Sequence, residues 1–376
     1  MRFFSFCKRY FTPSLSDSPR NNNFNLIRFV AAFMVIYGHT SALMGVGAFP
    51  LFSQAVSSIA VKIFFTISGY LVTKSFLSDS NFARYMIRRS FRIFPALIVV
   101  VLASVFIIGP IFTNLGAAGY FSHPGTRYYL LNILLHPVYS LPGVFTTYTY
   151  ANAVNGSLWT LPVEFVAYLI LPPVLVGFKK LGSMKTGVIL STAATLILSV
   201  LYLTVFRSAR CVIWGSDVFQ AIPLLPYFFA GSLFTFPQFR KLLNLQIGLA
   251  LALVASIART GNALNEILVF LTVPYLTLSF ALCEKPLFSQ WFSKCDFSYG
   301  LYLWGFPIQQ IVCARLARFG LSDWKTAWIS FVFVLMIAIP SWYLVEKPMQ
   351  QLGQKLVGIL RERQETKMQA KSEELK

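Results

Sequence analysis

Among the ionisable side chains inside long apolar stretches of the sequence, four could do acid–base or anion-binding chemistry, and charged groups at such places are costly and most often serve a function. Arg28 and His39 share the first stretch, Lys62 lies in the second, and Glu164 lies in a later one. Histidine exchanges a proton near neutral pH, and a buried carboxylate can orient a histidine or act as a base itself. These residue types are typical of a site that moves protons, in catalysis or in transport.

Arg28 and His39 are eleven residues apart, which is close to three helical turns. Both side chains are then expected on one helix face, about 16 Å apart along the axis. We expect Arg28 near the cytoplasmic end, where it could hold an anionic ligand, and His39 in the outer half. The alternative is that Arg28 extends to the membrane interface and His39 only hydrogen-bonds a neighbouring helix.

Lys62 and Glu164 extend this polar set. Lys62 falls at about the depth of His39, so it could face His39 or Glu164. Glu164 has Tyr168 one turn later on the same helix face, and it is expected to orient His39 or to act as a partner base. For both Lys62 and Glu164, the competing interpretation is a structural ion pair.

A basic and aromatic segment follows the second apolar stretch. It carries Arg84, Arg88, Arg89 and Arg92, and Pro95 is expected to mark the start of the next helix. Guanidinium groups bind phosphates through paired hydrogen bonds, so this cluster could hold a phosphorylated ligand. It could equally be the ordinary basic cluster of a cytoplasmic loop.

The remaining polar features are less specific. Ser68 and Gly69 form a small-residue pair that allows a helix or a ligand to approach closely. His123 and His136 have no acidic or cysteine neighbours at ligand spacing, so no metal site is predicted. The five cysteines are scattered and indicate neither a disulfide framework nor a zinc site.

The composition indicates which elements hold these residues. Of 376 residues, 56% are hydrophobic and only 12% are charged, and the mean hydropathy is +0.64, which is typical of a membrane protein. Apolar runs long enough to cross a bilayer of ~30 Å predict an all-α, polytopic bundle of about ten transmembrane helices. The predicted spans are 26–44, 55–77, 93–112, 156–178, 186–206, 218–236, 246–260, 264–283, 297–315 and 326–345. The run 128–141 is shorter and is expected to be interfacial or re-entrant.

The formal net charge of +19 comes from short basic clusters between apolar runs, which argues against a nucleic-acid partner. Loops on one side hold 22 basic residues and loops on the other side hold 7, so both termini are predicted to be cytoplasmic. We therefore divide the chain into a cytoplasmic N-terminal segment (1–25), a transmembrane domain (26–346) and a cytoplasmic polar tail (347–376). From Arg361 onward, this tail is expected to be a frayed helix or disordered.

Several segments together resemble the acyltransferase-3 family, the bacterial membrane O-acyltransferases that modify surface polysaccharides. The resemblance runs from residue 24 to residue 348, with the motifs in the family's order. The matching segments are Arg28–His39 (R-x10-H), Phe64–Leu71, Arg89–Pro95, Ser157–Glu164, Ser298–Trp304 and Glu346–Pro348. One departure is Gly305, where members of the family often carry a histidine.

This resemblance implies a donor, a reaction and a location. The donor would be an acyl-CoA, usually acetyl-CoA, used from the cytoplasm and not held as a tightly bound cofactor. The acceptor would be a hydroxyl of a free or lipid-linked saccharide, in lipopolysaccharide or a related glycoconjugate. The protein would lie among the lipids of the bacterial inner membrane. The implied roles are catalytic for His39 and Glu164, acyl-CoA binding for Arg28, Ser68, Gly69, Arg89 and Arg92, and supporting for Lys62, Trp159, Tyr168 and Tyr302.

Two other functional classes fit the same residues. Arg28, His39, Lys62 and Glu164 could form the relay of a proton-coupled transporter, although the sequence shows no internal repeat of the kind many transporters have. The chain could also be a non-enzymatic partner in polysaccharide export, in which case His39 would be dispensable. Consumption of acyl-CoA separates the enzyme from both alternatives. For the enzyme, direct transfer is favoured over an acylated His39, and the sequence leaves both open.

Overall fold

The computed structural model describes residues 22–258, 261–283, 287 and 295–374. Within these residues the secondary structure is nearly all helical, and the strands form only two short antiparallel hairpins. The first pairs β1 (Pro50–Leu51) with β2 (Gln54–Ala55), and the second pairs β3 (Val212–Ile213) with β4 (Ser216–Asp217). The predicted all-α fold class is confirmed.

Among the described residues, seven helices are long and apolar enough to cross a membrane, as expected for a multi-pass membrane protein. They are α2 (Phe24–Leu43), α3 (Val56–Ser78), α4 (Phe82–Ala103) continued by η1 (Ser104–Ile108) and α5 (Gly109–Phe112), α8 (Thr160–Lys180), α9 (Met184–Thr204), α14 (Asn262–Ala281), and α17 (Asp323–Ser341) continued by η5 (Trp342–Glu346) and α18 (Lys347–Glu374).

The other predicted spans also contain helices. The shorter apolar ones are α10 (Val218–Ala221) with η3 (Ile222–Leu224) and α11 (Leu225–Leu233), and α13 (Leu245–Ile257), while α16 (Ser298–Leu316) is mostly buried inside the bundle. Each of the ten predicted ranges therefore holds a helix. The number of helices that cross the membrane and the side of each terminus stay predictions.

Within the described residues, the segments that connect these helices contain only short helices. They include α6 (Gly116–Ser122), α7 (Pro124–Tyr128), η2 (Tyr129–Leu134), α12 (Pro237–Arg240) and η4 (Ala317–Phe319). The helix η2 ends at Leu135, whose φ of 59° is left-handed, so the run 128–141 contains no helix long enough to cross a bilayer.

The start of α4 corrects one prediction. The helix begins at Phe82 rather than near Pro95, because the side chain of Asn81 accepts a hydrogen bond from the backbone N–H of Arg84 at 3.0 Å and caps the end. Pro95 lies inside the helix instead. The arginine cluster is therefore helical, and residues three and four apart along it share a face.

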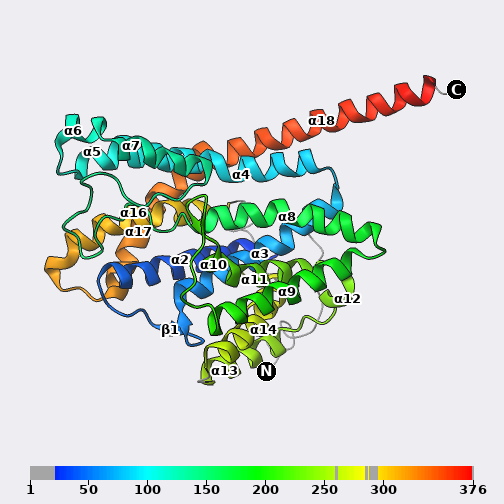
Figure 1. The fold of residues 1–376 in the computed structure, drawn as a ribbon, viewed down its shortest axis with the longest axis horizontal. Helices are drawn as coiled ribbons and strands as arrows, with labels where there is room; N and C mark the ends of the chain where they lie inside the picture. The colour runs from blue at the N-terminus through cyan, green and yellow to red at the C-terminus, as the bar shows by residue number, and fades with distance from the viewer. Residues whose placement is uncertain (1–21, 259–260, 284–286, 288–294, 375–376) are drawn as a thin grey trace.

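Figure 1 shows that the long helices run in the same general direction. The α3–α4 connection, the α8–α9 connection and the free end of α18 lie at one end of the bundle, and α5, α6 and α7 lie at the other. The polar tail is helical through Glu374. Of the two states expected from Arg361 onward, a frayed helix and disorder, the structure shows a helix.

Close contact with α11 fixes the position of α3 in the centre of the bundle. A Cβ atom added to Gly69 would overlap the backbone of Phe228, and one added to Gly231 would overlap the backbone of Thr66. The hydroxyl of Ser232 also donates to the carbonyl of Gly69 at 3.2 Å. Small residues allow this approach, as is typical of helix packing in membranes.

Candidate active site

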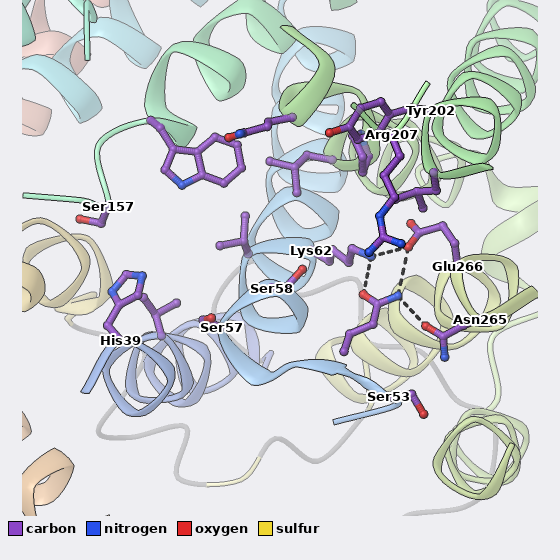
Figure 2. A pocket seen from close by; sticks show the side chains of 18 of the residues that line it. His39, Ser53, Ser57, Ser58, Lys62, Ser157, Tyr202, Arg207, Asn265 and Glu266 are labelled. Carbon is purple, nitrogen blue, oxygen red and sulfur yellow. Dashed lines mark hydrogen bonds and ion pairs between the residues drawn. The ribbon is translucent and has the colours of Figure 1, made fainter. Parts of the chain in front are cut away.

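A cavity of about 450 Å³ opens between α2, α3, the start of α8, the end of α9 and α14. Figure 2 shows His39 on one side of this larger cavity and Lys62 on the other. Its wall also contains the predicted residues Trp159 and Tyr302. The structure thus brings together residues from the first, second, fourth and ninth predicted spans.

His39 lies at the edge of the larger cavity with its side chain half buried. Its ring packs edge-on against Phe306, with a centroid distance of 5.3 Å and an interplanar angle of 73°. Among the described side chains, none forms a hydrogen bond or ion pair with His39. The ring nitrogens of His39 are therefore available to a ligand in the cavity. In a purely structural histidine they would hydrogen-bond to protein groups.

Lys62 lines the same cavity as His39, but its ionic partner is Glu266 of α14. The Lys62 Nζ and Glu266 Oε2 atoms are 2.7 Å apart, and both side chains are buried. Sequence reasoning expected His39 or Glu164 as the neighbour and missed Glu266. The signal was present, because Glu266 is itself an ionisable residue inside a predicted span.

A second, smaller cavity of about 60 Å³ lies next to the first. Val61 and Tyr302 line both cavities, so the two meet at these side chains. The smaller cavity gathers predicted residues from four helices, namely Arg28, Ser68, Arg92, Glu164 and Tyr168. Gly69 and Arg89 line neither cavity.

Glu164 belongs to the smaller cavity and does not hydrogen-bond His39. Its carboxylate accepts a hydrogen bond from the Ser68 hydroxyl at 2.6 Å and another from the Tyr168 hydroxyl. Tyr168, which the spacing placed on the same helix face, is therefore a hydrogen-bond partner of Glu164. These contacts direct Glu164 toward the junction of α3 and α8, so a direct orienting role for His39 has no geometric basis here.

Arg28 and Arg92 converge on one carboxylate, that of Asp296. The Asp296 Oδ2 atom is 3.2 Å from Arg28 Nη1 and 2.6 Å from Arg92 Nη2. Burial acts to raise the pKa of Asp296, but Arg92 and Arg28 outweigh that effect and hold it well below its usual range. Asp296 was missed because it precedes α16 in a segment that the sequence indicated only as a loop.

The family comparison covers the part of the chain that contains both cavities. The model of the Acyltransferase domain of acyltransferase-3 proteins matches residues 21–346. The chain belongs to the acyltransferase-3 family. The resemblance predicted from the motifs is therefore confirmed, and the protein is a membrane acyltransferase.

Three relatives are similar to this acyltransferase-3 protein. An O-acetyl transferase of Shigella phage Sf6 is 32% identical over 346 residues, covering 87% of this chain and 96% of the relative. Nodulation protein 10 of Rhizobium leguminosarum bv. viciae is 35% identical over 169 residues, covering 42% of this chain and 45% of the relative. Peptidoglycan O-acetyltransferase OatA of Listeria monocytogenes is 25% identical over 369 residues, covering 87% of this chain and 55% of the relative. No solved structure matches the chain.

Two family motifs meet at the junction of the cavities in this acyltransferase. The Tyr302 hydroxyl donates to the carbonyl of Ser157 at 2.7 Å and also pairs with the Thr160 hydroxyl. Asn155 donates to the carbonyl of Leu303 at 2.9 Å. These bonds hold the start of α8 against α16.

Gly305, at the departure from the family pattern, lies against Ile36 of α2. A Cβ atom added to Gly305 would meet Ile36 at an ordinary contact distance.

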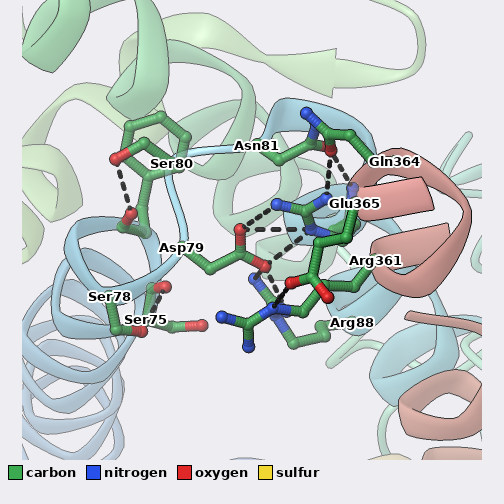
Figure 3. Close-up of polar contacts among 11 residues, drawn as sticks. Ser75, Ser78, Asp79, Ser80, Asn81, Arg88, Arg361, Gln364 and Glu365 are labelled. Atoms are coloured by element: carbon green, nitrogen blue, oxygen red, sulfur yellow. Dashed lines mark hydrogen bonds and ion pairs between the residues drawn. The ribbon is translucent and has the colours of Figure 1, made fainter. Parts of the chain in front are cut away.

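The other arginines of the acyltransferase lie at the end of the bundle near the free end of α18. Figure 3 shows Asp79 with Arg88 and with residues of α18. Hydrogen bonds from Arg84, together with Arg88, lower the pKa of Asp79 to about 2. Arg84 also donates to Gln364 at 2.6 Å and so ties α4 to α18. Arg84 and Arg88 therefore have structural partners. This favours, for these two residues, the ordinary basic cluster of a cytoplasmic loop over a phosphate site.

Proposed function

We propose that this protein is a membrane O-acetyltransferase that moves an acetyl group from acetyl-CoA on the cytoplasmic side of the bacterial inner membrane to a hydroxyl of a surface saccharide. The observation that carries the proposal is the junction of the two cavities at Val61 and Tyr302, with His39 on one side and Arg28 and Arg92 on the other. Donor and acceptor would thus approach one reaction point from separate cavities. The O-acetyl transferase relatives support the reaction.

The smaller cavity suits the narrow end of the donor. Its volume of about 60 Å³ is far below the 450 Å³ of the larger cavity. A space this small excludes the nucleotide of the donor and suits only its acetyl thioester end. Arg28 and Arg92 share the single carboxylate of Asp296, and both line the smaller cavity, where a guanidinium group can form charge-assisted hydrogen bonds with the anionic donor.

The larger cavity suits the acceptor, and His39 is the base within reach of it. In the proposed step, a nitrogen of His39 takes the proton of the acceptor hydroxyl as the oxygen attacks the thioester carbonyl carbon. The new C–O bond forms, the C–S bond breaks, and the proton passes from His39 to the CoA sulfur. The products are the acetyl ester and the free thiol of CoA, so direct transfer needs no covalent acyl-enzyme.

Glu164 has a positioning role in this proposal. It holds the Ser68 and Tyr168 hydroxyls at the passage through which the thioester would arrive. This assignment replaces its expected contact with His39. Trp159 and Tyr302 shape the wall of the larger cavity.

Membrane vesicles from cells that lack the gene, with and without the reintroduced gene, test the proposal. With radiolabelled acetyl-CoA at the cytoplasmic face, the parent protein should move label into saccharide esters that mild alkali releases. Label that stays on CoA equally in both vesicle types contradicts acetyl-CoA as the donor. Label released only as free acetate, with intact saccharide present, contradicts the saccharide acceptor.

A further inference from the structure

A buried polar network forms the wall of the larger cavity opposite His39. The ammonium of Lys62 donates to Gln54 Oε1 and to Glu266 Oε2, each at 2.7 Å, and lies 4.8 Å from the centre of the Tyr227 ring. The Gln54 amide donates in turn to Glu266 at 3.1 Å and to Asn265 at 2.8 Å. Figure 2 shows these bonds on the Lys62 side of the cavity. The network joins α3, the β1–β2 hairpin and α14.

The network is ordered but not saturated. Glu266 accepts from Lys62, Gln54 and Tyr227, which fills three of the roughly four acceptor positions of a carboxylate. Lys62 uses two of its three N–H donors for these side chains. One donor and one acceptor direction are thus left at a wall that lines the cavity. A hydroxyl group, which both donates and accepts, matches this combination.

Unpartnered hydroxyls continue the polar surface toward His39. Ser57 and Ser58 at the start of α3 line the cavity, and neither side chain hydrogen-bonds to another described residue. Trp159 and Tyr202 add aromatic surface to the wall. Small-molecule sites typically combine such apolar faces with a few placed polar groups, and their volumes of roughly 300–1,000 Å³ include that of this cavity.

A role in helix packing alone explains the network less well. A buried ion pair loses hydration that its attraction barely offsets, and apolar residues would join two helices at least as firmly. This pair also lies at the cavity wall rather than elsewhere along the contact between α3 and α14.

We propose that Lys62, Gln54 and Glu266, together with Ser58, form the subsite that recognises the hydroxyl groups of the acceptor saccharide. His39 on the opposite wall then meets the hydroxyl that is acetylated. This inference rests on the proposed O-acetyltransferase function and assigns acceptor specificity within it. It leaves donor binding to the smaller cavity.

Two variants test the subsite in cells that lack the native gene. Lys62→Met with Glu266→Gln removes both charges together, so neither is left buried and unpaired. Ser58→Ala removes only a hydroxyl without a protein partner and so keeps the test decisive if the double variant does not fold. The matched controls are Arg361→Gln with Glu365→Gln, an exposed ion pair on α18, and Ser199→Ala, a buried serine outside both cavities.

The measurements are the O-acetyl content of the surface polysaccharide in cells and acetyl-CoA binding by the purified protein in micelles. The double variant should lower the O-acetyl content at least about tenfold, as the loss of charged hydrogen-bonding groups does in recognition. Ser58→Ala should lower it by roughly twofold to tenfold. Acetyl-CoA binding by both variants and acetylation by both controls should stay within about twofold of the parent.

Parental acetylation by both variants would overturn the subsite. So would a parallel loss of acetylation and acetyl-CoA binding in Ser58→Ala, because that pattern indicates a structural role. A parent protein that neither binds acetyl-CoA nor acetylates the polysaccharide would instead contradict the proposed function itself.

Discussion

At the scale of single residues, Asp296 pairs with both arginines of the smaller cavity. It holds Arg28 and Arg92, whereas Arg89, three residues before Arg92, lines neither cavity. From the sequence alone, Arg89 and Arg92 are equivalent candidates for binding acyl-CoA. The structure separates them, because Arg92 pairs with Asp296 and lines the smaller cavity, whereas Arg89 lines neither cavity.

This separation predicts different effects of two similar substitutions. Arg92→Gln should weaken acetyl-CoA binding by about tenfold or more, because a charge-assisted contact with an anionic donor is lost. Arg28 still neutralises Asp296 in this variant, so the protein should fold. Calorimetry on purified protein in micelles measures the change.

Arg89→Gln is the matched control and should bind acetyl-CoA within about twofold of the parent. Equal weakening of acetyl-CoA binding by both substitutions would contradict the assignment of Arg92, rather than Arg89, to the binding of the donor.

The candidate site was partly predictable at this scale. The rule that charges inside spans mark function singled out Arg28, His39, Lys62 and Glu164, and the structure places each of them at one of the two cavities, while their roles stay predictions. It could not pair them, because the partners Glu266 and Asp296 lie more than 200 residues away in sequence from Lys62 and Arg92. Pairing across that separation depends on helix packing, which spacing along one helix does not encode.

At the scale of elements, the contact with α11 positions α3, whose side chains line both cavities. Sequence analysis left open whether Gly69 admits a helix or a ligand, and the structure places the backbone of α11 there. Similarly, the sequence suggested a helix start near Pro95, whereas the Asn81 cap starts α4 at Phe82. A single cap overrides the usual preference for proline in the first turn.

Gly69→Ala should therefore destabilise the protein by roughly 1–3 kcal/mol or more, as overpacking does. A thermal unfolding series in micelles measures the loss. Gly305→Ala is the control, because its Cβ would meet Ile36 at 3.5 Å, an ordinary contact. A Gly69→Ala protein with parental stability but weakened acetyl-CoA binding would instead support the donor-binding role first assigned to this residue.

Asp79 holds the Arg84 side chain that donates to Gln364 of α18, so its titration predicts a pH dependence for the attachment of α18. The Arg84 hydrogen bonds lower the pKa of Asp79 from 3.8 to about 2. A lowered pKa means that the contribution to stability is fully present above about pH 4 and is lost as the pH falls toward 2. Hydrogen exchange at residues 361–366 should rise over that window, relative to residues 186–200 in α9.

Asp79→Asn should give the faster exchange already at pH 7, since the amide cannot pair with Arg84 and Arg88 as an ion. Unchanged exchange in this variant would mean that packing alone holds α18 against α4.

At the scale of the whole molecule, hydropathy located a helix in each of the ten predicted ranges, because length and apolar composition are local properties. It did not show that only seven of the described helices are long and apolar enough to cross by themselves. The apolar helices Val218–Leu233 and Leu245–Ile257 are shorter than their predicted spans, because hydropathy does not resolve where a helix begins and ends.

The basic bias predicts that the β3–β4 hairpin faces outward while both termini face the cytoplasm. Cys211 precedes this hairpin and is exposed, which makes it a natural probe. A membrane-impermeant maleimide should label Cys211 in intact spheroplasts, and Cys211→Ser should remove that label. Labelling of Cys211 only after the membrane is opened would reverse the predicted orientation.

The central claim is that His39 takes the proton of the acceptor hydroxyl, and His39→Gln tests it most directly. Glutamine can keep a hydrogen bond but cannot take a proton at neutral pH. The measurement is the O-acetyl content of the surface polysaccharide in cells whose only copy of the gene carries the variant, with acetyl-CoA binding by the purified variant as the control. We expect binding within about twofold of the parent and acetyl transfer reduced by ~10²–10⁴, the usual contribution of a general base. Parental O-acetyl content in the His39→Gln cells would contradict the account.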